Sequence, residues 1–159
     1  MTETNWQQDQ LSMYGKLVDI PRLQAWYGEF IYSYSGLTMQ PQAFTPLLSH
    51  IKKQIEAHTG HQFNGLLVNC YRNQHDTVGW HSDDEVELGN NPVIASLSLG
   101  EERNFQLKHK VTGEKLSFPL KSGSLLIMAG ETQHYWQHCL PRTKKEKAAR
   151  INLTFRWIN

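Results

Sequence analysis

The chain has one segment with helical periodicity and many short segments with strand periodicity. Residues 45–59 carry apolar side chains at helical spacing, namely Leu47, Leu48, Ile51 and Ile55. Thr45 can cap this segment, Pro46 suits its first turn and Gly60 can end it. We therefore expect a helix over residues 45–59. A second helix is expected either just upstream of Pro46 or in the N-terminal stretch WQQDQLSMYG.

From residue 63 onward the pattern changes to short β-rich segments that are separated by turn residues. These segments are FNGLLVNCYR, NPVIASLSLG, RNFQLKHK, KLSFPL, GSLLIMAG and RINLTFRWI, and the aromatic stretch 22–34 has the same character. Many short strands with little helix favour an antiparallel double sheet or barrel, with a helix covering one face. At 159 residues, without a linker or repeat, we expect a single domain over residues 1–159.

The last of these strands carries an unusual polar stripe. Alternation places Ile151, Leu153 and Phe155 on one face, and on the other Arg150, Asn152, Thr154 and Arg156. On an exposed sheet such a face would be ordinary. Inside a double sheet, two arginines on one face would need an anion, and guanidinium groups bind carboxylates in a bidentate way. A dicarboxylate ligand is thus one of two interpretations of the stripe.

Composition fits a globular protein rather than a disordered or membrane-spanning chain. Charged residues make up 19% and hydrophobic residues 39%, and no apolar run approaches the length of a membrane span. With a net charge of +1, contact with nucleic acid would depend on local basic patches. Cys70 and Cys139 lack CxxC spacing, so we expect two reduced, buried thiols. The polar N-terminus carries no secretory signal, which favours a cytoplasmic location.

Candidate metal chemistry lies in GWHSDDEVELG, residues 79–89. On an extended segment His81 and Asp83 point the same way and can converge on one ion. A site of two histidines and one carboxylate needs a further histidine and leaves positions open on iron. His134 and His138 both follow the GSLLIMAG strand, and spacing only slightly favours His138. The alternative is a surface histidine beside solvated acids.

Several ordered motifs resemble one known family. NCYRNQHDTVGWHSDDE, PVIASLSLG, GSLLIMAGETQHYWQHCLP and ARINLTFR, with PRLQAWYGE and YSYS upstream, are similar to the AlkB family of iron(II)- and 2-oxoglutarate-dependent dioxygenases. The similarity is closest to the homologue 3 branch, with homologue 2 next, and runs from about Trp6 to the end. It implies a mainly β fold, a double-stranded β-helix or jelly roll, with one or two flanking helices.

The resemblance also assigns residues to the metal and to 2-oxoglutarate. It implies the iron ligands His81, Asp83 and His138, which displaces His134. The family's NxY motif, whose side chains bind 2-oxoglutarate, matches Asn69 and Tyr71. The family's paired arginines match Arg150 and Arg156, and the stripe residues between them, Asn152 and Thr154, are expected to contribute from the same face.

For the substrate the resemblance implies a pocket for a flipped base. Asp84 matches the family position that contacts the base, and the residues that match or line the surrounding pocket are Trp6, Arg22, Tyr32, Ser33, Tyr34 and Leu67. A carboxylate and aromatic faces suit cationic bases such as 1-methyladenine and 3-methylcytosine. For the tyrosines, core packing is the alternative. Family members usually carry more chain before Trp6, so we expect a truncated or reduced N-terminal lobe.

The implied function is oxidative demethylation in the repair of alkylated DNA, with RNA as a further substrate class. The reaction would use Fe(II), 2-oxoglutarate and O2 and release succinate, CO2 and formaldehyde. Two alternatives stay open: the same oxygenase chemistry on RNA or protein side chains, and a catalytically silent jelly roll that binds nucleic acid. We expect a monomer without membrane contact, in the cytoplasm, or in the nucleus if the source is eukaryotic.

Overall fold

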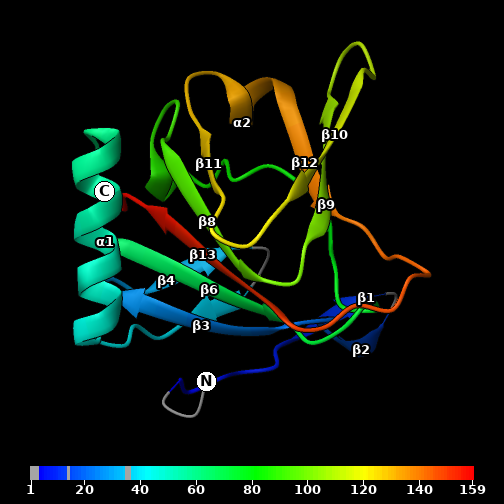
Figure 1. The fold of residues 1–159 in the computed structure, drawn as a ribbon, viewed down its shortest axis with the longest axis horizontal. Helices are drawn as coiled ribbons and strands as arrows, with labels where there is room; N and C mark the ends of the chain where they lie inside the picture. The colour runs from blue at the N-terminus through cyan, green and yellow to red at the C-terminus, as the bar shows by residue number, and fades with distance from the viewer. Residues whose placement is uncertain (1–3, 14, 35–36) are drawn as a thin grey trace.

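The computed structural model describes residues 4–13, 15–34 and 37–159. Two antiparallel sheets face each other, as the jelly-roll prediction requires (Figure 1). The five-stranded sheet has the order β11 (Leu125–Met128), β8 (Ile94–Gly100), β13 (Arg150–Arg156), β6 (Gly65–Tyr71) and β3 (Leu23–Gly28). The four-stranded sheet has the order β10 (Lys115–Leu120), β9 (Arg103–His109), β12 (Trp136–Leu140) and β7 (Val78–His81).

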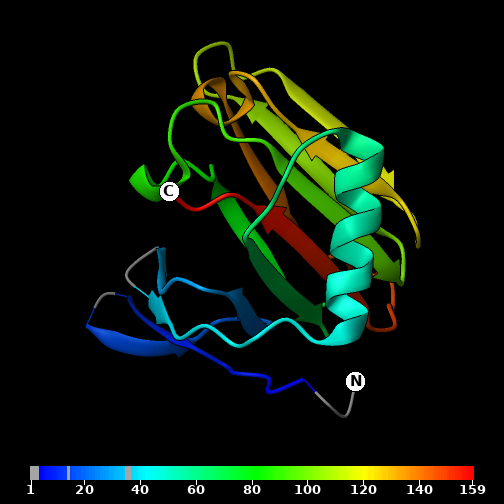
Figure 2. The ribbon, with the colours of Figure 1, turned by 90° about the vertical axis from the view of Figure 1, so that its left-hand side faces the viewer.

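The expected helix is confirmed as α1 (Pro46–Thr59), with both expected caps. Leu48 donates its backbone N–H to Thr45 Oγ1, and Gly60 ends the helix in the left-handed region at φ 74°. The helix lies against the outer face of the five-stranded sheet (Figure 2), where Ile55 is buried. The prediction that one helix covers a face of the double sheet is therefore confirmed.

The expectation of a second helix in WQQDQLSMYG or upstream of Pro46 is wrong. Residues of that stretch form β1 (Gln10–Met13), which pairs with β2 (Lys16–Asp19) in a hairpin. Gly15, at φ 75°, allows the tight reversal that joins the two strands. Upstream of Pro46, Gln42 instead bridges to Tyr27. The second helix is the single turn α2 (Thr132–Tyr135), and the remaining elements are the 3-10 turn η1 (Val86–Leu88) and the hairpin of β4 (Tyr32–Tyr34) with β5 (Leu37–Met39).

Strand alternation divides the core into two clusters, one on each face of the five-stranded sheet. Leu66 and Val68 of β6 pack under α1 with Leu153 and Phe155 of β13. Leu67 points the other way and joins the cluster between the two sheets. The polar stripe of β13 shares that inner side, so its residues are buried rather than exposed. Among the described residues, no helix is long and apolar enough to cross a membrane.

Candidate metal and co-substrate site

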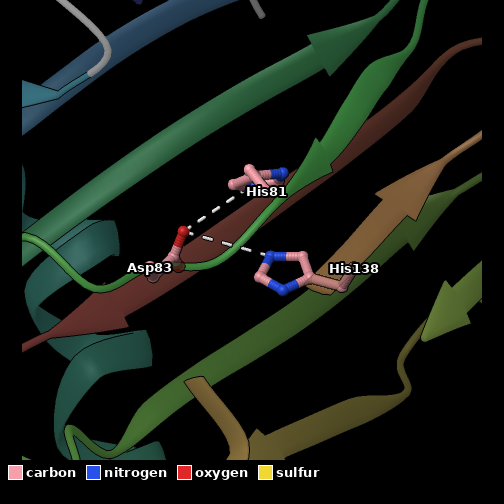
Figure 3. A group of neighbouring side chains, drawn as sticks. All are labelled: His81, Asp83 and His138. Carbon is pink, nitrogen blue, oxygen red and sulfur yellow. Dashed lines mark ion pairs between the residues drawn. The ribbon is translucent and has the colours of Figure 1, made fainter. Parts of the chain in front are cut away.

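Two histidines and one aspartate converge between the sheets (Figure 3). His81 ends β7, and His138 lies directly opposite it on the neighbouring strand β12. Asp83 follows two residues after His81, with its Oδ1 at 3.5 Å from His81 Nε2 and 3.9 Å from His138 Nε2. The ligand atoms all lie within 4.8 Å of one another, so one ion can reach all three. His134 lies apart from this group, exposed on α2.

The histidine rings are already oriented for metal binding. His81 Nδ1 donates to the carbonyl oxygen of Gly79 at 2.8 Å, so Nε2 is the atom that would bind an ion once it gives up the proton it shares with Asp83. His138 stacks on Phe105 at 5.4 Å between ring centroids, and its Nδ1 is buried without a hydrogen-bond partner. An imidazole in such a place is more stable when neutral, which is the form that binds metals.

The electrostatics of the three residues follow from burial and mutual contact. Burial, helped by the positive charge of His81, lowers the pKa of His138 from 6.5 to about 4. Burial also opposes charge on His81, but the hydrogen bond to Asp83, the charge of Asp83 and the hydrogen bond to Gly79 together outweigh it and raise the pKa of His81. Burial alone would raise the pKa of Asp83, but Arg156 and then the two histidines hold it well below its ordinary value. The carboxylate is thus ionised and ready to ligate.

Arg156 joins the polar stripe to the metal group. Its Nη2 donates to Asp83 Oδ2 at 3.1 Å, and its Nη1 donates to Tyr32 Oη at 3.0 Å. All three side chains are at most 10% exposed. A buried guanidinium beside the candidate ligands places a fixed positive charge where an anionic co-substrate could approach the ion.

Arg150, at the other end of the stripe, is a buried cation without an acidic partner among the described residues. Its side chain is only 2% exposed, and burial lowers its pKa. Nη2 donates to Ser98 Oγ at 2.9 Å and the guanidinium lies 5.3 Å from the Tyr71 ring centre, while Nε has no hydrogen-bond partner. An unneutralised buried charge is costly, so this environment fits an anionic ligand.

Asn69 lies on β6, the strand next to the polar stripe, where it pairs with Asn152 in the β6–β13 ladder. Its Oδ1 accepts hydrogen bonds from Arg22 Nε and Gln24 Nε2, both at 2.9 Å. Because both bonds end on the oxygen, the NH₂ group is the part of Asn69 left for a ligand. One cavity joins these groups, lined by His81, Asp83, His138, Asn69, Tyr71, Arg22, Leu67, Arg150, Asn152, Thr154 and Arg156.

The residues expected around a base divide into several groups. Arg22 and Leu67 line the cavity. Tyr32 stacks on Trp26 at 4.6 Å in the core cluster, which agrees with the core-packing alternative, although its hydroxyl reaches Arg156. Ser33 is exposed, and its hydroxyl oxygen lies 3.3 Å from the hydroxyl oxygen of Thr38. Tyr34 belongs to β4, but its side chain lies outside the described residues.

Two of the expected substrate residues lie away from the cavity. Trp6 packs beside α1 on the opposite face of the five-stranded sheet, in a groove with Tyr27 and Leu48. Trp6 therefore lies apart from the cavity of the metal group, beside which sequence reasoning expected it. Asp84 is exposed, and its Oδ2 lies 3.6 Å from Lys110 Nζ, outside the cavity lining.

Sequence reasoning missed several residues that hold the site together. Ser96 and Ser98 of β8 lie opposite Thr154 and Asn152 in the β13 ladder, and each accepts a hydrogen bond from the stripe. Their alternation within IASLSLG was a signal that could have found them. Glu85, for which sequence reasoning offered only solvation or a neighbouring hydrogen bond, has a partly buried carboxyl that hydrogen-bonds Tyr32.

Comparison with known proteins points to one family. The family model of the 2OG-Fe(II) oxygenase superfamily matches residues 2–156. The alpha-ketoglutarate-dependent dioxygenase alkB homolog 3 of Bos taurus is 49% identical over 148 residues, which are 87% of this chain and 52% of that protein. The Homo sapiens protein of the same name is 48% identical, with the same coverage. This chain spans about half the length of these relatives.

A second group of relatives and a solved structure agree with this picture. The DNA oxidative demethylase ALKBH2 of Homo sapiens is 40% identical over 158 residues, which are 93% of this chain and 60% of that protein. The solved structure described as that of OsALKBH1 superposes with a TM-score of 0.62 at 22% identity, and covers 94% of this chain and 80% of that one. That likeness supports the fold alone.

Proposed function

This chain belongs to the 2OG-Fe(II) oxygenase superfamily, in its AlkB branch, and from that premise we propose that it is an oxidative demethylase of alkylated DNA. The substrates would be N-alkylated bases such as 1-methyladenine and 3-methylcytosine. The names of the relatives, alpha-ketoglutarate-dependent dioxygenase and DNA oxidative demethylase, support this reaction class. We further propose that residues 1–159 act as one catalytic domain.

The observation that carries the proposal is the position of the metal group beside a buried pair of arginines. His81, Asp83 and His138 supply a two-histidine, one-carboxylate set, which leaves other positions of an iron ion open. Arg150 and Arg156 lie on the same cavity and are 2% and 3% exposed. A protein that only binds nucleic acid needs neither feature, which argues against the silent jelly roll.

His81, Asp83 and His138 would hold the iron, and the neighbouring polar groups would bind 2-oxoglutarate. When bound, the iron with 2-oxoglutarate and O2 supplies the oxidation of an N-methyl carbon, giving succinate, CO2, formaldehyde and the unmodified base. Arg156, in contact with Asp83, would take the carboxylate nearer the metal. Arg150 and Tyr71 would take the distant one, with Asn69, Asn152 and Thr154 completing the walls.

A cationic alkylated base would enter from the mouth of the cavity. Arg22 and Leu67 line the cavity, Tyr32 reaches the lining residue Arg156, and Asp84 is exposed outside the lining. The side chain of Asp84 would turn away from Lys110 and attract the cationic ring instead, since an exposed ion pair is weak. Ser33 and Tyr34, on the neighbouring hairpin, would flank the unpaired strand, where a base released from its stack needs new contacts.

Contacts to the phosphate backbone would come from exposed basic residues of the segment between β12 and β13. Arg142, Lys144 and Lys145 are exposed there, whereas Lys147 pairs with Glu101 at 2.8 Å. Such contacts position a strand without reading its sequence. We further propose that the chain acts as a monomer. A DNA substrate would place it in the cytoplasm, or in the nucleus if the source is eukaryotic. The two free, buried cysteines suit such a reducing compartment.

Formaldehyde release from methylated oligonucleotides tests the proposal. We expect turnover on 1-methyladenine in single-stranded or duplex DNA that depends on 2-oxoglutarate, and loss of release to the level without protein in Asp83→Ala. Asp19→Ala, which changes an exposed aspartate of the β1–β2 hairpin, should keep full activity. Turnover on methylated RNA or peptide but not on DNA would replace the substrate assignment, and full turnover in Asp83→Ala would contradict the ligand assignment.

The binding-module alternative is separated by an anaerobic titration with iron(II) and 2-oxoglutarate. Co-substrate bound to iron through its keto and carboxylate oxygens gives a metal-to-ligand charge-transfer absorption, which we expect here. Its absence, together with binding of methylated oligonucleotides, would favour a silent binder.

A further inference from the structure

Asp83 is the least supported of the three candidate ligands by regular structure. His138 is held in the ladders of β12 with β9 and with β7, and His81 is the last residue of β7. Asp83 lies beyond the end of that strand and takes part in neither ladder. Its backbone position must therefore be set by contacts other than strand pairing.

The contact that holds the Asp83 backbone comes from Gln133, in the single turn α2. The backbone N–H of Asp83 donates to Gln133 Oε1 at 2.9 Å. Gln133 is 2% exposed, and its Nε2 faces Met128 Sδ at 3.6 Å. Because a backbone N–H can only donate and sulfur is only a weak acceptor, the amide oxygen must be the end that faces Asp83.

Two further contacts tie the same segments together. Ser82 Oγ donates to the carbonyl oxygen of Trp136 at 2.9 Å. Lys110 Nζ donates to the carbonyl oxygen of Gln133 at 2.9 Å and also lies 3.6 Å from Asp84 Oδ2. Ser82 is therefore fixed next to Asp83 by the residue at which α2 passes into β12, and Lys110 links Gln133 to the exposed carboxylate of Asp84 only through a weak ion pair.

We propose that Gln133 is a positioning residue, which sets the place of the Asp83 carboxylate relative to His138. The turn that carries Gln133 continues into β12, so one segment determines the position of both ligands. The inference rests on the proposed function in that Asp83 is taken as a metal ligand. Gln133 itself contacts neither the ion nor a substrate.

The expected size of the effect follows from what Gln133 supplies. Removing its oxygen leaves the Asp83 N–H buried without an acceptor, and the segment shifts to find one. Residues that orient a metal ligand typically contribute 10- to 100-fold to metal affinity. We expect Gln133→Leu, which keeps approximate volume and removes the acceptor, to weaken binding by about 10-fold.

Cobalt(II) is a suitable probe, because it needs no oxygen or substrate and its visible absorption reports ligand geometry. Titration of the wild-type chain should give a saturable spectrum. Gln133→Leu should show the weaker affinity and altered band intensities. Gln133→Glu, which keeps an oxygen acceptor in either protonation state, should restore both. Gln137→Leu is the matched control, since Gln137 lies on β12 nearby without such a hydrogen bond.

A milder variant keeps the test decisive if Gln133→Leu does not fold. Ser82→Ala removes only the second contact of the segment and should weaken cobalt binding by a few-fold with an intact fold. Wild-type affinity and spectrum in folded Gln133→Leu, or in Ser82→Ala where Gln133→Leu does not fold, would overturn the inference. A wild-type chain that binds no cobalt would instead contradict the metal site of the proposed function.

Discussion

His138 is a residue whose environment makes a charged imidazole unfavourable. Its pKa falls from 6.5 to about 4, first through burial and then through His81. Between these values the unfolded chain binds a proton at His138 that the folded chain does not. The free energy of unfolding of the metal-free protein should therefore fall, by up to about 3 kcal/mol, as the pH drops from 6.5 to 4. Above pH 6.5 His138 is neutral in both the folded and the unfolded chain, so this loss of stability is absent.

The test compares urea unfolding of the metal-free wild type and His138→Gln at several pH values. His81, whose pKa is raised, acts in the opposite direction, because its contribution is lost as the pH rises through that raised pKa. Since His81 is present in both proteins, the difference between them isolates His138. We expect a shallower pH dependence between 6.5 and 4 in the variant, and equal slopes would contradict the assignment.

Arg150 and Arg156 should respond differently to loss of their charge. Arg150 has no acidic partner among the described residues, so Arg150→Met should leave the melting temperature of the metal-free protein unchanged or higher. Arg156→Met removes the partner of a buried Asp83 and should destabilise the protein by about 3 kcal/mol.

Both arginine variants should bind 2-oxoglutarate at least about 10-fold more weakly, because each loses charge-assisted hydrogen bonds. Calorimetry of melting and of 2-oxoglutarate binding to the manganese-loaded protein checks both expectations. A large loss of stability in Arg150→Met would show that Arg150 serves the fold rather than a ligand.

At the scale of elements, the approach of β6 to β3 depends on a glycine. A Cβ built at Gly65 would overlap Trp26 Cη2, so Gly65→Ala must displace the indole. Trp26 stacks on Tyr32, whose hydroxyl meets Arg156, so strand packing connects directly to the candidate site. We expect a loss of about 2 kcal/mol in the free energy of unfolding.

The matched control for Gly65→Ala is Gly79→Ala, in β7. A Cβ at Gly79 meets nothing within 4 Å, and its backbone is not in the left-handed region. Chemical denaturation of both variants measures the difference. Equal stability of the two would mean that Trp26 moves aside without cost, and that the contact between these strands does not constrain the site.

At the scale of the whole molecule, the candidate site joins the two sheets. His81 and His138 come from the four-stranded sheet, whereas Asn69, Arg150 and Arg156 come from the five-stranded sheet. Manganese with a non-reactive 2-oxoglutarate analogue should therefore stabilise the fold. At 100 times the dissociation constant the gain is about 2.7 kcal/mol, or roughly 5 to 10 °C in melting temperature.

The ligand effect is checked by thermal melting with metal alone, analogue alone and both. The two together should exceed either alone in the wild type, and Asp83→Ala should lose most of the gain. A full gain from the analogue without metal would show that the acid binds away from the metal group.

Local patterns along the chain were enough to predict the helix α1 and the polar face of the last strand. Caps at Thr45 and Gly60 fixed α1, because their effect depends only on neighbouring residues. Alternation placed Arg150 and Arg156 on one face, and the two-residue spacing of His81 and Asp83 indicated a metal pair. The same local reasoning failed in WQQDQLSMYG, where pairing with β2 overrode any helical tendency.

Which groups each face of a strand contacts depended on how the strands pack in the folded chain. Alternation cannot tell which strand lies opposite His81, and the β7–β12 ladder selects His138 rather than His134. It likewise could not reveal that Trp6 enters on the helix side, or that Gln133 holds the Asp83 backbone. Such contacts join residues far apart in the chain, and they form because buried polar groups must find partners wherever folding brings them together.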